Sequence, residues 1–489
     1  MKKLWLLLCL VLISPALFLS GCGEEQALNS YALVLTYDDE TKSAQGACAV
    51  DYVNTSNNAF DSVLFHLYSN AFSQEGEGLV CSTSNEAKTY PNGKSYGGIE
   101  ITSVKVGGSE AEYSVEGEAG MLLNVKLLQQ LFPDERVKIE IDFVLTLPNA
   151  NHRFGYGDNA VNFGNFYPIA CVYEEGEGFM DEGYIANGDP FYSNVANYSV
   201  TVSYPKNFKI ACSGDNLKTG ENGQYLTTTF NANNVRDVSF VLSQNFNVVS
   251  ANSGDCQIDY YYYDDADPQG SLDTAVKAVQ FYGESFGEYP YSSLAVVQTN
   301  FVHGGMEYPR LVMIADTVSG VDYDYVIAHE IAHQWWYGVV GNDEYHEAWL
   351  DESLTEFSTA LFFENYPEYN ISYNQIISGA EENYKFFLQI YDKIQGEVDS
   401  SMLRALNEFS TEPEYVNNIY TRGILLFDTL RSEIGDKKLL STLKGYYKEF
   451  AYQNVNSSEF IAYFSSKAGR NLEKFFDSWL NGKVEFVYV

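Results

Sequence analysis

Two histidines and a glutamate in the second half of the chain have the types and the spacing of a metal site. His329-Glu330-x-x-His333 lies in a proline-free stretch, 326–340, whose pattern is typical of a helix. Residues four apart share one face of a helix, so the two imidazoles can bind one ion. Glu330 lies one position beyond His329, where its carboxylate can serve as a general base without being a ligand.

A second helical stretch, 347–366, supplies a third ligand. Glu352 follows His333 after 18 intervening residues. Two histidines and one glutamate leave the fourth position of a tetrahedral zinc ion open, which is the arrangement of catalytic rather than structural zinc sites. The sequence therefore predicts one zinc ion held by His329, His333 and Glu352.

The zinc motif and a segment upstream of it resemble the membrane alanyl aminopeptidase family of gluzincin zinc peptidases. The shared features are the His-Glu-x-x-His motif, the 18-residue spacing and the position of Glu352 after Trp-Leu-Asp. The upstream segment, Gly-Gly-Met-Glu, ends at Glu307, 22 residues before His329. It is similar to the family's Gly-x-Met-Glu-Asn exopeptidase motif.

The resemblance implies how this upstream segment acts. Glu307 would bind the free α-ammonium of a peptide, and the adjacent backbone of Gly304, Gly305 and Met306 would hold the peptide like an added strand. A fixed carboxylate near the zinc favours a protonated N-terminus through a charge-assisted hydrogen bond. It also sets the distance from that end to the scissile bond. Tyr308 stands where the family has asparagine.

Further site residues follow from the resemblance or from helix spacing. Tyr420-Thr-Arg-Gly is similar to the family's Tyr-x-Lys-Gly segment, which implies that Tyr420 donates a hydrogen bond to the oxyanion. Tyr415 matches a family position that lines the pocket. Glu356 lies four residues beyond Glu352 and is either a hydrogen-bond partner of a ligand histidine or an exposed helix carboxylate. The same two interpretations apply to Asp351, for which solvent exposure is favoured.

Two features that the resemblance leads us to expect are missing. Residues 150–200 contain no obvious counterpart of the glutamine or glutamate that helps to hold the amine. The chain ends at Val489, before the family's large C-terminal helical domain. The predicted function is a zinc-dependent aminopeptidase that hydrolyses N-terminal residues from peptide or protein substrates. The alternatives are a zinc endopeptidase of the same fold and an inactive peptide-binding lipoprotein; the general base Glu330 argues against the latter.

The start of the chain has the pattern of a secretory signal. A short basic segment precedes an apolar stretch, 4–19, and Leu19-Ser-Gly-Cys22 resembles the bacterial lipobox. Residues 1–21 are therefore predicted to be a signal peptide, with lipidation at Cys22. No later segment approaches 18 consecutive apolar residues, so the lipid is the expected membrane anchor. This implies an extracytoplasmic lipoprotein of the bacterial cell membrane.

The hydrophobic pattern divides the rest of the chain into two parts. After a linker at 22–30, residues 31–254 contain many short runs of period two, which are typical of strands and predict an N-terminal β-sandwich or saddle-like domain. Residues 255–489 are mainly helical in pattern, with two strands near 294–298 and 310–314. The fold class is multidomain α+β, and the resemblance implies a thermolysin-like catalytic domain with a small sheet.

Charge and cysteine content limit the partners. Acidic residues outnumber basic ones by 66 to 29, and the net charge of -37 argues against a nucleic-acid partner. Five cysteines lie outside the signal and the lipobox, and none forms a C-x-x-C pair. Buried thiols are favoured over a disulfide framework. The oligomeric state and the preferred N-terminal residue stay open.

Overall fold

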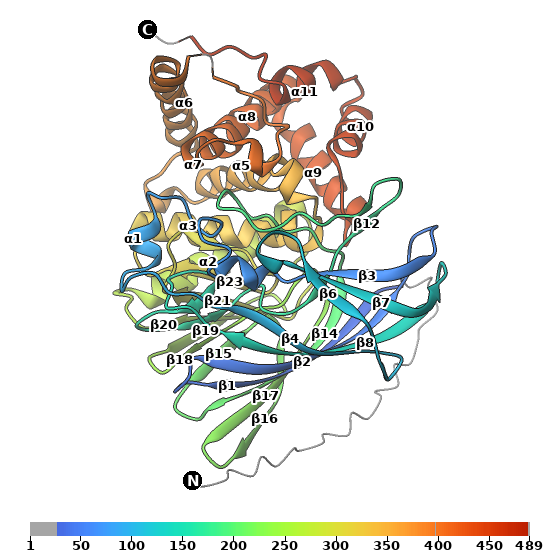
Figure 1. Cartoon of the computed structure of the whole chain (residues 1–489). Helices are drawn as coiled ribbons and strands as arrows, with labels where there is room; N and C mark the ends of the chain where they lie inside the picture. The colour runs from blue at the N-terminus through green and yellow to red at the C-terminus, as the bar shows by residue number, and fades with distance from the viewer. Residues whose placement is uncertain (1–26, 397, 488–489) are drawn as a thin grey trace.

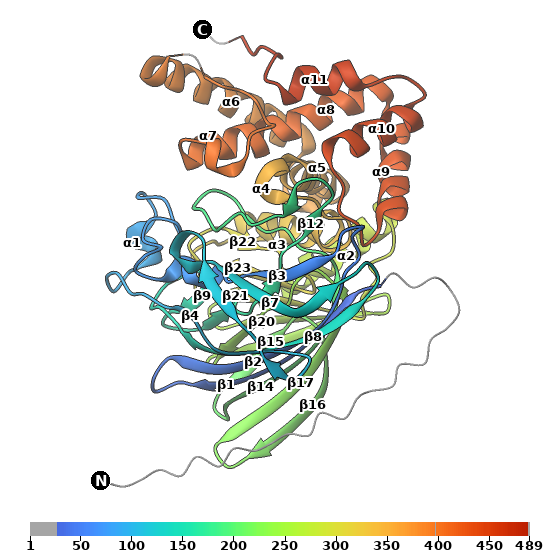
Figure 2. The ribbon, with the colours of Figure 1, turned by 45° about the vertical axis from the view of Figure 1, so that its right-hand side comes forward.

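The computed structural model describes residues 27–396 and 398–487. A strand-rich N-terminal part lies on one side of the molecule and a layer of C-terminal helices on the other, with the helices of the zinc motif between them (Figures 1 and 2). The predicted signal peptide and Cys22 lie outside the described residues. Within those residues, no helix has the length and apolar character needed to cross a membrane.

An eight-stranded sheet forms the floor of the N-terminal part. Its first strand shows the predicted period of two, because Tyr31, Leu33, Leu35 and Tyr37 are buried on one face. This strand, β1 (Asn29–Asp38), pairs parallel with β14 (Ala196–Pro205) and antiparallel with β2 (Ser43–Val53). From edge to edge the strands are β16 (Asp215–Asn222), β17 (Tyr225–Val235), β14 (Ala196–Pro205), β1 (Asn29–Asp38), β2 (Ser43–Val53), β8 (Arg136–Thr146), β4 (Gly98–Val106) and β5 (Ser109–Glu110).

Three smaller sheets complete this part, and the predicted β-sandwich is confirmed. The first consists of β15 (Lys209–Cys212), β18 (Phe240–Ser243), β10 (Val161–Phe163) and β9 (Phe154–Tyr156). The second consists of β11 (Ile169–Ala170), β3 (Phe60–His66), β7 (Leu122–Leu131) and β6 (Tyr113–Glu116), and the third of β12 (Tyr173–Glu174) and β13 (Gly178–Phe179). A short helix, α1 (Glu86–Thr89), lies beside them. All five cysteines in the described ranges are free thiols.

A five-stranded sheet begins the C-terminal part. Its order is β19 (Asn247–Ser253), β20 (Cys256–Tyr262), β21 (Ser293–Thr299), β23 (Leu311–Ala315) and β22 (Gly305–Met306). The predicted boundary at residue 254 falls in the turn of the hairpin between β19 and β20. At the opposite edge, β22 pairs antiparallel with β23 and carries the Gly-Gly-Met-Glu segment.

The C-terminal part is otherwise helical, as predicted. Asp267 caps α2 by accepting a hydrogen bond from the Gly270 amide. The zinc-motif helix α3 (Val321–His333) contacts α2, α5 (Trp349–Asn365) and β23. The helices are α2 (Pro268–Phe286), α3 (Val321–His333), α4 (Glu344–Glu347), α5 (Trp349–Asn365), α6 (Tyr373–Gln395), α7 (Glu412–Val416), α8 (Arg422–Ile434), α9 (Asp436–Phe450), α10 (Ser457–Ala468) and α11 (Glu473–Leu480).

The zinc-motif helix is enclosed by protein. Its apolar residues Ile327, Ala328, Ile331 and Ala332 are fully buried, and the helix continues as a π-helical turn, Gln334–Val339. The charged residues of its C-terminal half are buried as well. Buried charged groups need partners or a bound ion, so the groups around this helix must supply one or the other.

Candidate active site

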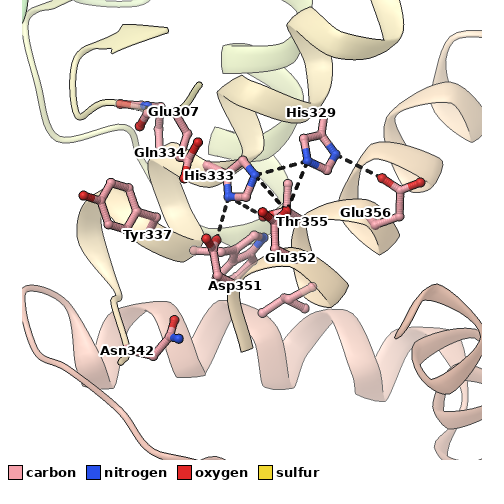
Figure 3. A network of polar contacts seen from close by, with 12 residues as sticks. Glu307, His329, His333, Gln334, Tyr337, Asn342, Asp351, Glu352, Thr355 and Glu356 are labelled. Carbon is pink, nitrogen blue, oxygen red and sulfur yellow. Dashed lines mark hydrogen bonds and ion pairs between the residues drawn. The ribbon is translucent and has the colours of Figure 1, made fainter. Parts of the chain in front are cut away.

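Three ligand atoms from α3 and α5 converge on one point. His329 Nε2 lies 3.1 Å from His333 Nε2, and these two nitrogens lie 3.5 and 3.4 Å from Glu352 Oε2 (Figure 3). Ligands of a tetrahedral zinc ion, bound at about 2.0–2.1 Å, are about 3.3 Å apart. Glu352 Oε2 has no hydrogen-bond donor among the described residues. The spacing and chemistry of the three predicted ligands therefore fit zinc.

The opposite nitrogens of both histidines are held by carboxylates. His333 Nδ1 lies 2.6 Å from Asp351 Oδ1, and His329 Nδ1 lies 3.0 Å from Glu356 Oε2. Tyr325 donates a hydrogen bond to the other oxygen of Glu356. Such contacts fix the tautomer and direct Nε2 to the metal. The expectation that Asp351 faces solvent is wrong, because α5 buries it against His333 and leaves it 1 % exposed.

Glu330 lies beside the edge strand β22. It is 5 % exposed, and its Oε2 has no hydrogen-bond partner among the described residues. Burial raises the pKa of Glu330 to about 7. A Cβ atom on residue 305 would lie 2.3 Å from Glu330 Oε1, whereas one on residue 304 would lie 3.5 Å from Val326. Gly305, unlike Gly304, is thus required by a close approach to the Glu330 carboxylate.

Glu307 follows Gly305 and Met306 and faces the zinc motif. Its carboxylate, the carboxylate of Glu330 and the imidazole of His333 each offer one possible ligand atom, and these three atoms lie within 4.8 Å of one another. Gln334 donates hydrogen bonds to the carbonyls of Glu307 and Tyr308, at 3.3 and 3.1 Å. Burial, and next the charge of Asp189, raise the pKa of Glu307 well above its usual range. The two hydrogen bonds from Gln334 hold the motif against the end of α3.

The tyrosine that replaces the family's asparagine has a structural explanation. Tyr308 is fully buried and donates a hydrogen bond to Asn165 Oδ1 at 2.5 Å. Asn165 in turn donates to Asp237 Oδ2 at 2.9 Å. A Cβ atom on residue 164 would lie 2.0 Å from the Tyr308 hydroxyl, so Gly164 makes room for it. Tyr308 thus connects the motif to the N-terminal part.

The two predicted tyrosines lie together at the ligands. Tyr420 donates a short hydrogen bond to Glu352 Oε1, and its ring stacks on His329 with centroids 6.0 Å apart. The ring of Tyr415 is 5.8 Å from that of Tyr420, and its buried hydroxyl has no hydrogen-bond partner among the described residues. The structure therefore brings all the predicted site residues from 304 to 420 into one cluster.

Sequence reasoning missed two acidic residues of this cluster. Asp189, in the loop before β14, pairs with the buried Arg153 at 2.5 Å, and Arg153 also donates to Met306 Sδ at 3.0 Å. Glu344 of α4 is 2 % exposed, and its oxygens lie near those of Glu307. Neither residue has motif spacing, and only an Asp-Pro pair marks Asp189 in the sequence. Contacts across the fold were needed to find them.

Comparisons with known proteins agree with this geometry. Residues 270–479 match the family model described as Peptidase family M1 domain. Aminopeptidase N of Lactococcus lactis subsp. lactis is 27 % identical over 230 residues, which are 43 % of this chain and 26 % of that protein. Rice aminopeptidase M1-A is 25 % identical over 227 residues, which are 43 % of this chain and 25 % of that protein. The chain thus spans about a quarter of the length of these curated relatives.

Solved structures match almost the whole chain. A mutant M1 zinc metallopeptidase from Deinococcus radiodurans superposes with a TM-score of 0.67 at 17 % identity, covering 94 % of this chain and 95 % of that one. The same mutant bound to a Tyr-Ser-Ala substrate gives a TM-score of 0.65 at 17 % identity, covering 94 % of each chain. The likeness extends over both the strand-rich and the helical parts and shows the fold.

Proposed function

We propose, because residues 270–479 match the model of the peptidase family M1 domain, that this protein is a zinc-dependent aminopeptidase acting on peptides with a free N-terminus. The observation that carries the proposal is the spacing of 3.1–3.5 Å between the facing atoms of His329, His333 and Glu352. Glu330 and Glu307 each offer an oxygen within 4.8 Å of one another and of a ring nitrogen of His333. The curated relatives named above are aminopeptidases, which supports the same activity.

The chain's own residues provide the acid–base chemistry. When bound, the zinc ion supplies a Lewis acid that polarises the peptide carbonyl and lowers the pKa of water. Glu330 accepts the proton of the attacking water and then delivers it to the leaving amine. Its pKa of about 7 suits both roles near neutral pH. Tyr420 turns its hydroxyl from Glu352 to the oxyanion, a contribution of about 3 kcal/mol when such a donor is preorganised.

Glu307 makes the reaction an exopeptidase reaction. Its buried carboxylate offers an oxygen within 4.8 Å of one of Glu330, and Oε1 has no hydrogen-bond partner among the described residues, so it is available to pair with a substrate ammonium. A charge-assisted hydrogen bond there fixes the N-terminus, so only the first peptide bond reaches Glu330. A substrate whose amine is acetylated cannot form this bond.

The proposal is tested with aminoacyl-arylamides and their N-acetylated forms. The zinc-loaded protein should hydrolyse the free-amine substrates and leave the acetylated ones almost untouched. Glu330→Gln should keep its zinc, measured by atomic absorption, and lose turnover about 1000-fold or more, because the general base is gone. Equal rates on free and acetylated substrates would assign the endopeptidase activity instead. Zinc-loaded protein that cleaves neither would leave the peptide-binding alternative.

We propose further that the protein is a lipoprotein on the outer side of the bacterial cell membrane. The support is the sequence Leu-Ser-Gly-Cys22 after a basic and apolar start. Metabolic labelling with a radioactive fatty acid in a bacterial host should label the wild type, while Cys22→Ala should stay unlabelled. Equal labelling of both would refute lipidation at this cysteine.

A further inference from the structure

A buried serine next to the zinc ligand Glu352 joins two of the helical segments on which the site is built. Ser353 belongs to α5 and is fully buried. Its hydroxyl donates a hydrogen bond to the backbone carbonyl of Ile419 at 2.7 Å. Ile419 directly precedes Tyr420. The residue after a zinc ligand is therefore bonded to the residue before the proposed oxyanion donor.

The segment that carries Tyr420 is not a regular α-helix. A π-helical turn, Asn417–Thr421, lies between α7 and α8. In such a turn the amides pair with carbonyls five residues earlier instead of four, and the interrupted ladder allows the helix to kink. Contacts with neighbouring elements therefore decide how the turn presents Tyr420. Ser353 supplies one of them from α5, and Tyr384 of α6 supplies another by donating to Asn418 Oδ1 at 3.1 Å.

The first turn of α8 packs directly on Ser353. A Cβ atom on residue 423 would lie 2.1 Å from Ser353 Oγ and 3.0 Å from Ser353 Cα. Gly423 is buried, and its φ does not lie in the left-handed region. Glycine is thus required here by the close approach of the two helices and not by its own backbone conformation. The contact fixes the separation of α5 and α8 at the level of the zinc ligand Glu352.

The hydroxyl of Tyr420 lies among the zinc ligands at the other end of this arrangement. It donates to Glu352 Oε1, and its ring stacks on His329 with centroids 6.0 Å apart. An oxyanion donor acts only at hydrogen-bond distance, and a shift of the order of 1 Å at a reacting group costs about 100-fold in rate. The bond from Ser353 to the backbone beside Tyr420 restricts such a shift.

We infer that Ser353 is a positioning residue for the oxyanion donor. Its hydrogen bond to Ile419 and its packing against Gly423 set where the Tyr420 hydroxyl lies relative to the zinc ligands. Because Ser353 and Glu352 are consecutive residues of α5, one turn of this helix places both a metal ligand and the tyrosine. The inference rests on the proposed aminopeptidase function, in which Tyr420 serves the oxyanion.

The test is a double-mutant cycle of Ser353→Ala and Tyr420→Phe in the zinc-loaded protein, with leucyl-arylamide as the substrate. Tyr420→Phe should lower kcat about 100- to 1000-fold, as for the loss of one oxyanion donor. Ser353→Ala should lower kcat about 10- to 100-fold and leave KM and zinc content unchanged, because the misplaced donor acts in the transition state. The double variant should be no slower than Tyr420→Phe, since Ser353 then has no hydroxyl to position.

Ser358→Ala is the matched control on the same helix. Ser358 is fully buried, accepts a hydrogen bond from Trp336 Nε1 at 2.9 Å and donates one to the Leu354 carbonyl. Both serine variants should lower Tm, because each leaves a buried polar group without its partner, but only Ser353→Ala should lower kcat.

Three results would overturn the inference: additive losses in the cycle, a fall in kcat of the same size for both serine variants, or a Tyr420→Phe variant as active as the wild type. The aminopeptidase proposal is judged separately, by Glu330→Gln and by the acetylated substrates. It stands if the wild type hydrolyses only free-amine substrates, whatever the serine variants do.

Discussion

The backbone of Gly305 lies against the carboxylate of Glu330, so closely that a Cβ atom on residue 305 would be 2.3 Å from Oε1. The Gly-Gly-Met-Glu segment and the proposed general base Glu330 are therefore in direct contact. The second glycine of the motif is required by this contact and not by a turn.

Gly305→Ala should displace the Glu330 carboxylate, which is the flexible end of a side chain. We expect kcat to fall about 100-fold, because a shift of the order of 1 Å at a reacting group has that effect. Zinc content should not change. Gly304→Ala is the matched control, since its Cβ would make an ordinary contact of 3.5 Å with Val326. Equal kcat values for the two variants would contradict this explanation.

The contact between Glu356 and His329 Nδ1 predicts a change in zinc affinity. Glu356→Ala removes the carboxylate that orients this ligand, and the zinc dissociation constant should rise about 10- to 100-fold. Competition with a chromophoric chelator measures it. Glu364→Ala, at an exposed position of the same helix α5, should leave zinc affinity unchanged. A loss of the same size in both variants would show a general effect on the helix.

Asparagine, the residue of the resembled family at this position, should make this protein less stable than Tyr308 does. Tyr308→Phe loses the hydrogen bond to Asn165 and should lower the free energy of unfolding by about 1 kcal/mol. Tyr308→Asn also leaves a cavity in a fully buried site, at a cost of about 3–5 kcal/mol. Urea unfolding of the zinc-loaded protein measures both. An asparagine variant as stable as the wild type would contradict the packing described here.

The buried carboxyl of Asp237 should make the stability of the protein depend on pH. Burial raises the pKa of Asp237 to about 7 in the folded protein, from an ordinary value near 3.8. The folded state therefore binds more protons than the unfolded state between these values. The contribution of Asp237 to stability is fully present below about pH 4 and is lost as the pH rises through 7.

Asp237→Asn removes this titration. The difference in Tm between the variant and the wild type should therefore shift in favour of the variant as the pH rises from 4 to 7. Thermal denaturation in buffers across this range measures it. Asp142→Asn, at an exposed position of β8, provides the control with a flat difference. A flat difference for Asp237→Asn as well would show that burial does not govern this carboxyl.

The sequence determined most of the candidate zinc site because those residues depend on short-range spacing. His329 and His333 lie on one helix face by the geometry of a single element, and the strands of period two gave the β-sandwich for the same reason. Glu352 could be named because its spacing matched a known family. The mainly helical second part and the two strands around the glycine-rich turn were likewise predicted correctly.

What only the tertiary structure decided concerns residues brought together from distant parts of the chain. Asp351 was expected to face solvent, yet α5 turns it into the protein against His333. Asn165 and Tyr308 are 143 residues apart and share a hydrogen bond. Glu344 and Glu307 have no common motif, yet their carboxylate oxygens lie within 4.8 Å of each other in the folded chain. Periodicity within an element shows which face is buried, but the partner across that face is set by packing between elements, which the order of residues alone does not specify.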